Sequence, residues 1–246
     1  MDGKIYTLNI AHLYPTLLNI YGDWGNVLAL KKRCEWRGIE VNVDSIELGD
    51  SIDIDKYDLY FLGGGQDQQQ AVVSKELQKH KESLLSARDN DAVFLAICGG
   101  YQLLGAFYQP NNDEKLLGIG LLDSYTIGSK TRFIGNVTAE CDCVKPNTLV
   151  GFENHSGVTY LGGDTKPLSK IIVGNGNNGE DGTEGARYKN VFGTYLHGSF
   201  LPKNPHFADY LLTTAMQRKY GFNFALSKLD DCFETAAHES VINKKY

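Results

Sequence analysis

The segment AVFLAICGGYQLLG, residues 92–105, joins an unbroken apolar run to two glycines and then to a helix-like pattern. Residues 92–97 are apolar throughout rather than alternating, which is typical of a strand buried on both faces of a sheet. Cys98 follows this strand directly, and Gly99 and Gly100 supply the small residues that a sharp strand-to-helix turn tolerates. The segment therefore predicts a cysteine at the carboxyl edge of a central parallel strand.

Strand-like and helix-like segments alternate on the N-terminal side of this turn. The predicted strands are 4–11, 39–47, 57–62 and 92–97, and the predicted helices are 23–37, 67–88 and 101–108. Asp23 is the expected N-cap of the first helix, and Gly38 follows its end. This order predicts an α/β fold with a mostly parallel sheet and helices on both faces.

The second half of the chain has a different pattern of predicted secondary structure. Shorter β-like pieces follow residue 115, and one amphipathic helix is predicted over about 205–219. No Pro- or Ser-rich linker separates the halves, so we expect a single domain over residues 1–246, with its core at about 5–220 and a C-terminal helix or tail at about 221–246. The fold class is therefore α/β with a β-rich second half.

Composition limits the possible functions. The 246 residues are 42% hydrophobic and 22% charged, which is normal for a globular chain. A net charge of −6 argues against a nucleic-acid surface, and no apolar run is long enough to cross a membrane. The five cysteines have irregular spacing, so we expect free thiols, no metal site and a reducing, cytoplasmic location.

A cysteine nucleophile needs a base and a site for the oxyanion that its attack creates. The helix N-terminus beside Cys98 favours the thiolate. Glycines 63–65 end the preceding strand, and their backbone N–H groups could form an oxyanion hole with that of Gly99. His197 lies in VFGTYLHGSF at 191–200, where it ends an apolar strand-like run just before a glycine, while His155 lies in a similar context and remains the alternative base.

Several motifs then resemble one family. CGGYQ at 98–102 is similar to the nucleophile signature of class I, triad-type glutamine amidotransferases, and GTYLHG at 193–198 resembles the histidine motif of the cobyric-acid-synthase branch. Together with NIYGDWGN, GGGQDQ, VGFENHSG and LPKNP, they look most like the glutaminase subunits of lipid II isoglutaminyl synthase. The resemblance covers about residues 5–220 and implies a flavodoxin-like, doubly wound fold.

The resemblance also implies roles for individual residues. Cys98 would attack the side-chain amide of glutamine, and His197 would activate it and protonate the departing ammonia. Gly64, Gly65 and Gly99 would form the oxyanion hole. Gln102 would bind the α-substituents of the substrate. Arg132 in SKTRFIGN would bind its α-carboxylate through a bidentate ion pair.

One position departs from the wider family. Its members carry a glutamate two residues after the histidine, where this chain has Ser199. The cobyric-acid-synthase branch shows the same departure. We expect the group that orients His197 to come from outside this motif, from an acidic residue of a partner chain, and Glu153 is the competing internal candidate.

The weaker motifs predict no cofactor in this chain. GSKT at 128–131 lacks the glycines of a phosphate-binding loop, the loop at 174–185 fails calcium-site spacing, and Cys141 and Cys143 have no second pair of metal ligands. Making an amide from a carboxylate requires activation, so ATP and magnesium are expected on a partner. The resemblance implies a MurT-like, Mur-ligase-type synthetase that acts on lipid-linked substrate at the inner membrane face.

Three other functions remain open at this point. One is a non-catalytic binding module that keeps the fold as a docking surface, although an intact Cys98, His197 and Gln102 argue against it. The chain could be the glutaminase of a different, cobyric-acid-synthase-like amidotransferase. It could also be a DJ-1-type cysteine hydrolase of the same architecture, although Gln102 and GTYLHG argue against that reading.

Overall fold

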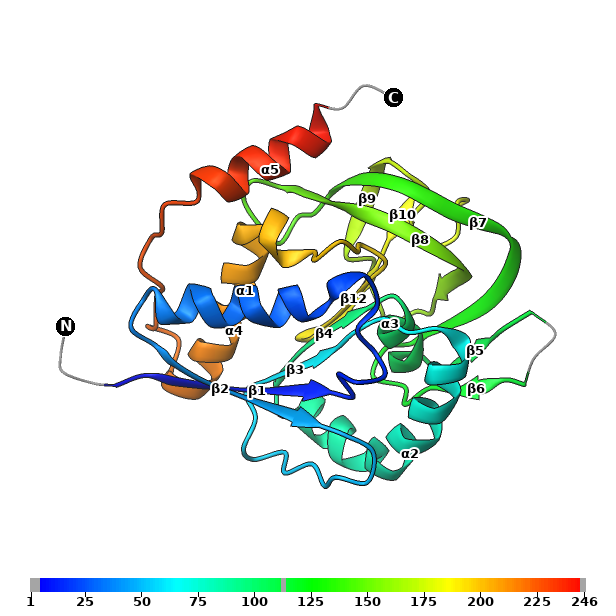
Figure 1. Cartoon of the computed structure of the whole chain (residues 1–246), viewed down its shortest axis with the longest axis horizontal. Helices are drawn as coiled ribbons and strands as arrows, with labels where there is room; N and C mark the ends of the chain where they lie inside the picture. Colours follow the sequence, from blue (N-terminus) through cyan, green and yellow to red (C-terminus); the bar gives the residue numbers. More distant parts are fainter. Residues whose placement is uncertain (1–4, 112–113, 244–246) are drawn as a thin grey trace.

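Six strands form the first sheet of the computed structural model, which describes residues 5–111 and 114–243 (Figure 1). Their order is β11-β12-β4-β3-β1-β2, in which β11 is antiparallel to β12 and the other neighbours are parallel. The bounds are β1 (Thr7–Leu13), β2 (Glu40–Ile46), β3 (Leu59–Leu62), β4 (Val93–Ile97), β11 (Ala186–Tyr188) and β12 (Val191–Thr194). The parallel part has the strand order of a flavodoxin-like sheet.

Helices cover both faces of this sheet. The core on one face includes α1 (Trp24–Glu35) and α4 (Pro205–Tyr220), and the core on the other includes α2 (Asp67–Asp89) and α3 (Gly99–Leu104). Successive residues of β3 alternate between these cores, with Phe61 in the first and Leu62 in the second. No helix in the described parts of the chain has the length and apolar character that crossing a membrane requires. The predicted doubly wound α/β fold is therefore confirmed.

The β-rich second half builds a second sheet beside the first (Figure 1). Its strand order is β10-β9-β7-β5-β6, and β8 also pairs with β7 along most of its length. The bounds are β5 (Phe107–Gln109), β6 (Leu116–Leu117), β7 (Ser124–Glu140), β8 (Thr148–Leu161), β9 (Ser169–Val173) and β10 (Thr183–Glu184). Within the predicted C-terminal helix or tail lies α5 (Cys232–Ile242). Two short 3-10 helices are η1 (Ile20–Gly22) and η2 (Leu201–Lys203).

The predicted helix over 101–108 is wrong in its second half. The helix α3 starts at Gly99 and ends at Leu104, and residues 107–109 instead form β5. Tyr108 pairs with Leu116 of β6 and with Thr126 of β7, so distant strands supply its sheet partners. A short apolar run fits a helix or a strand equally well, and long-range pairing decides between them here.

Three strand ends place the candidate residues at one edge of the first sheet. Leu62 of β3 is in register with Ala96 of β4, and Ile97 of β4 is in register with Thr194 of β12. The segments after these parallel strands therefore leave the sheet on the same side, as in other open α/β sheets. His197 also forms an isolated antiparallel bridge with Phe152 of β8, which joins the two sheets at this edge.

Candidate active site

Cys98 lies in the turn between β4 and α3, as predicted. Its backbone has φ 49° and ψ −105°, a conformation that residues other than glycine rarely adopt. Its N–H donates to the Thr194 carbonyl at 2.8 Å, which fixes the turn to the neighbouring strand β12. The side chain is half-buried and faces a cavity. This geometry matches the strained elbow on which a nucleophile is exposed above a sheet.

His197 approaches Cys98 across the backbone of Gly64. A Cβ atom on Gly64 would lie 3.2 Å from His197 Cε1 and 3.4 Å from the Cβ of Cys98. A side chain at position 64 would therefore be in tight contact with the imidazole and in contact with the cysteine side chain. His197 is fully buried, and both its backbone polar groups pair with Phe152. The structure thus brings together the two residues that the sequence assigns to nucleophile and base.

Asp23 is a third member of this cluster, and the sequence analysis missed it. One carboxylate oxygen, Oδ1, lies 3.9 Å from His197 Nδ1, and the other, Oδ2, accepts the Gly64 N–H at 2.6 Å. Both side chains are fully buried. Within the described residues, Oδ1 and the two ring nitrogens of His197 have no hydrogen-bond partner. Asp23 does occupy the N-cap position of α1, but its side chain makes no capping hydrogen bond there.

The surroundings of His197 favour its charged form. Burial alone lowers the pKa of the imidazole, but interactions with Cys98 and Asp23 outweigh burial and raise the pKa to about 10. A protonated imidazole beside a nucleophile can act as a general acid. The cluster can therefore store the proton that the leaving group will need.

Ser199 and Glu153 have other partners. Ser199 Oγ donates to the carbonyl of Gly22 at 2.9 Å, so the residue that replaces the family's glutamate holds the segment that leads into Asp23. Glu153 accepts hydrogen bonds from the backbone N–H groups of Asn175 and Gly176, each at 2.9 Å. Its carboxylate thus anchors the start of the loop at 174–185.

The predicted oxyanion-hole residues do not have equivalent surroundings. The N–H of Gly64 is engaged by Asp23. A Cβ atom on Gly99 would lie 3.0 Å from the backbone nitrogen of Gly65, so the main chains of these two residues approach closely next to Cys98. Gly65 and Gly99 are therefore the better placed donors for a developing oxyanion.

A cavity of about 300 Å³ opens over Cys98, and Gly65, Gln102 and Arg132 contribute to its lining. Arg132 is exposed, and its Nε donates to Asn154 Oδ1 at 2.7 Å. Gln102 is buried; its Nε2 donates to the Tyr195 hydroxyl at 3.1 Å, and its Oε1 has no partner within the described residues. The cavity therefore offers a cation near the nucleophile, which suits an α-carboxylate, while the unpaired amide oxygen of Gln102 is itself buried.

His155, the alternative base, lies in the wall of the same cavity. Its Nδ1–H donates to the Gly157 carbonyl at 2.7 Å, and its ring stacks on Tyr195 with 3.6 Å between ring centroids. Burial lowers the pKa of His155 to about 4, so the ring is neutral near pH 7. No hydrogen bond, ion pair or ring contact joins it to Cys98 within the described residues, and we keep His197 as the proposed base.

The GSKT motif at 128–131 does not have the secondary structure of a phosphate-binding loop. Residues 128–131 are part of the strand β7 rather than a strand-to-helix turn. The predicted absence of an ATP site in this chain remains a prediction.

Comparison with known proteins connects this geometry to a reaction. Residues 9–205 match the model of the CobB/CobQ-like glutamine amidotransferase domain. The lipid II isoglutaminyl synthase (glutamine-hydrolyzing) subunit GatD of Streptococcus pneumoniae is 45% identical over 246 residues, which cover 99% of this chain and 94% of the relative. The same subunit of Staphylococcus aureus is 42% identical over 98% of this chain and 97% of its own length.

A solved structure supports the fold independently of close sequence similarity. The glutamine amidotransferase of Thermotoga maritima superimposes with a TM-score of 0.57 at 13% identity, covering 95% of this chain and 93% of that structure.

Proposed function

Because this chain belongs to the CobB/CobQ-like glutamine amidotransferase family and, within it, to the GatD subunits, we propose that it releases ammonia from L-glutamine through a Cys98 thioester for a synthetase partner. The observation that carries the site assignment is the cluster of half-buried Cys98 with the buried His197 and Asp23, in which Cys98 lines a cavity that Arg132 also lines. The partner would be a MurT-like, Mur-ligase-type chain that uses ATP and magnesium. It would amidate the α-carboxyl of D-glutamate in the lipid II stem peptide.

The first step would be attack of the Cys98 sulfur on the side-chain amide carbon of glutamine. The negative charge that develops on the amide oxygen would be stabilised by the N–H groups of Gly65 and Gly99. Collapse of this intermediate breaks the C–N bond, and the proton held by His197 goes to the departing nitrogen, which leaves as ammonia. The product on the enzyme is a γ-glutamyl thioester of Cys98.

The second step would be hydrolysis of that thioester. His197, now neutral, would take a proton from water, and the resulting hydroxide would attack the thioester carbonyl. Glutamate is released, and the Cys98–His197 ion pair is restored. Asp23 would hold the imidazole in one orientation and stabilise its charged form in both steps, in the way that a triad carboxylate does.

We expect the rate of glutamine hydrolysis to depend on the partner, because Asp23 and His197 are not hydrogen-bonded in the isolated chain. The 3.9 Å between Asp23 Oδ1 and His197 Nδ1 is longer than a hydrogen bond. We expect the isolated chain to hydrolyse glutamine slowly and to accelerate when the synthetase binds, whether binding tightens this pair or supplies a further carboxylate. Ammonia release in saturating glutamine, measured with and without the partner, checks this expectation. Equal rates would contradict it.

The pathway can be tested by recovering the partner. Affinity-tagged full-length chain would be purified from its native host, and the bound chain would be identified by mass spectrometry. We expect a Mur-ligase-like protein, and glutamine-dependent amidation of lipid II when ATP is added to the recovered complex. A corrin-pathway synthetase in its place would contradict the lipid II assignment and leave the glutaminase chemistry intact. This reaction would place the chain in the cytoplasm, at the inner membrane face.

Substitution of Arg132 tests the proposed substrate contact. We expect Arg132→Ala to lower kcat/KM for glutamine about 10- to 150-fold, because one charge-assisted contact contributes roughly 1.5–3 kcal/mol. Arg132→Lys should restore only part of this, since lysine keeps the charge and loses the two-pronged geometry. Steady-state kinetics over a range of glutamine concentrations give the comparison. Lys130→Ala, another exposed cation in β7, is the matched control, and an unchanged kcat/KM in Arg132→Ala would remove Arg132 from the site.

A further inference from the structure

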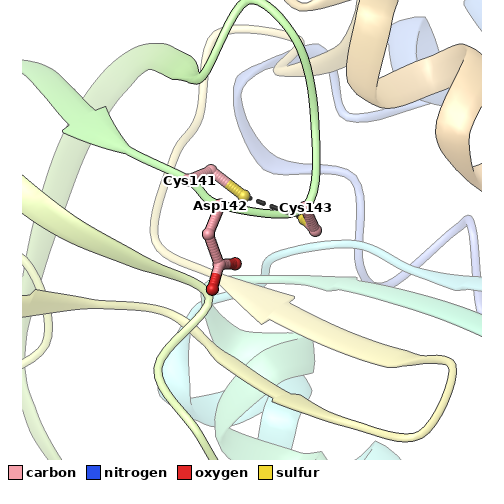
Figure 2. Close-up of side chains that lie close together, drawn as sticks. All are labelled: Cys141, Asp142 and Cys143. Carbon is pink, nitrogen blue, oxygen red and sulfur yellow. Dashed lines mark hydrogen bonds between the residues drawn. The ribbon is translucent and has the colours of Figure 1, made fainter.

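Two cysteines outside the active site lie against each other in the turn between β7 and β8. Cys141 Sγ and Cys143 Sγ are 2.9 Å apart (Figure 2). The backbone N–H of Cys141 donates to the Asn147 carbonyl at 2.7 Å, which closes the turn and holds the two residues on one short loop. A disulfide bond needs a sulfur–sulfur distance of about 2.05 Å, so the two sulfurs would have to come closer to form one.

The two thiols differ in exposure. Cys141 is fully buried, whereas Cys143 is half-buried and therefore more accessible to a reagent. The hydrogen bond from Cys141, together with the nearby Arg187, lowers the pKa of Cys143 despite its burial, and the same hydrogen bond raises the pKa of Cys141. This asymmetry separates an attacking thiolate from a buried thiol that reacts second.

A cation-rich hollow of about 470 Å³ adjoins the turn. Asp142, which separates the two cysteines, lines it and pairs with Arg187 at 2.8 Å. Its wall includes four cationic and two anionic side chains: Lys145, Lys166, Lys170 and Arg187 against Glu140 and Asp142. Neither cysteine lines the hollow, but on a chain whose net charge is −6 this excess of positive charge beside the turn favours an anionic reagent.

We propose that Cys141 and Cys143 form a redox-active dithiol that exchanges with an anionic, low-molecular-weight disulfide of the glutathione class. The Cys143 thiolate attacks one sulfur of the small disulfide, forms a mixed disulfide and releases the first small thiolate. Cys141 then loses its proton and attacks the Cys143 sulfur, which releases the second. The protein loses two protons and two electrons, and the small disulfide takes up both to become two thiols.

A metal site is the competing reading of the same cluster. Cys141, Asp142 and Cys143 could each offer a ligand atom, and these atoms lie within 4.8 Å of one another. However, the Asp142 carboxylate points away from both sulfurs in Figure 2 and is paired with Arg187. A structural zinc site takes four ligands, and the group found in the described residues has three.

The experiment uses full-length chain in a Cys98→Ala, Cys232→Ser background, which removes the proposed nucleophile and the exposed cysteine. Intact-mass spectrometry after incubation with glutathione disulfide is expected to show the loss of two hydrogens, and peptide mapping should place the bond between Cys141 and Cys143. Adding Cys141→Ser should trap one glutathione on Cys143. Adding Cys143→Ser should prevent both products.

Three results would overturn the proposal: retention of both thiols, equal trapping on Cys141 in the Cys143→Ser chain, or one retained zinc ion that requires all three residues. The hollow is tested by Lys170→Glu, which should slow exchange with glutathione disulfide about 10-fold and leave exchange with neutral hydroxyethyl disulfide unchanged. Lys228→Glu, at an exposed lysine outside the hollow, is the matched control. Equal effects of the two substitutions would remove the hollow from the proposal.

Discussion

Cys98→Ser is expected to abolish glutamine hydrolysis, with a loss in kcat of at least about 10⁴-fold. Serine keeps the size of the side chain, but its hydroxyl is far less acidic than a thiol, and His197 cannot hold it as an anion. The backbone at position 98 is unchanged by this substitution, so the fold should persist. Ammonia release by the purified chain measures the effect, and circular dichroism reports the fold.

The base is tested in the same assay. His197→Gln should be nearly as damaging as Cys98→Ser, because a nucleophile and its base act as one unit. His155→Gln is the matched control, since His155 lines the same cavity without a hydrogen bond to Cys98 in the described residues. Activity close to that of the unmodified chain in Cys98→Ser would place the nucleophile elsewhere. A larger loss in His155→Gln than in His197→Gln would identify His155 as the base.

Asp23→Asn is expected to lower kcat by up to about 10⁴-fold, which is the loss seen when a triad loses its orienting carboxylate. Asparagine has the shape of aspartate and can still accept the Gly64 N–H through its amide oxygen, so the local structure should survive. What it loses is the negative charge beside His197. That charge helps to raise the pKa of His197 to about 10.

The pH profile separates this electrostatic role from a purely structural one. Without the Asp23 charge, the pKa of His197 should fall, so the limb of the kcat profile that reports loss of its proton should move to lower pH. The assay would be repeated with the synthetase bound, because a carboxylate supplied by the partner could restore the lost rate. An unchanged kcat and profile in the isolated Asp23→Asn chain would exclude Asp23 as the orienting group. Leu28→Ala, at an exposed position of the same helix, controls for local disturbance.

The sequence predicted the features that local chemistry determines. The apolar run 92–97 and the glycines after it predicted the strand, the turn and Cys98 at the sheet edge, and the structure has all three. His197 was placed by the same reasoning, since it follows an apolar strand. Arg132 and Gln102 came from a family resemblance, and the cavity brings both to Cys98, although their roles stay predictions.

The sequence did not reveal contacts between distant segments. Asp23 has the local signature of a helix cap, and its contacts with Gly64, 41 residues away, and with His197 arise only when three strand ends meet. The missing glutamate at Ser199 showed that the orienting group lay elsewhere, but not where. Gly64 was assigned to the oxyanion hole for a similar reason, because a glycine run does not show which N–H group is already engaged.

The positive φ of Cys98 has a consequence for how this protein can change over time. A side chain held in that backbone conformation destabilises the folded state by roughly 1–3 kcal/mol, a sizeable part of the net stability of a domain. Glycine at position 98 would relieve the strain and remove the nucleophile in a single substitution. Natural variants selected only for thermal robustness would therefore drift toward inactivity at this position, whereas active lineages must recover the lost stability elsewhere in the fold.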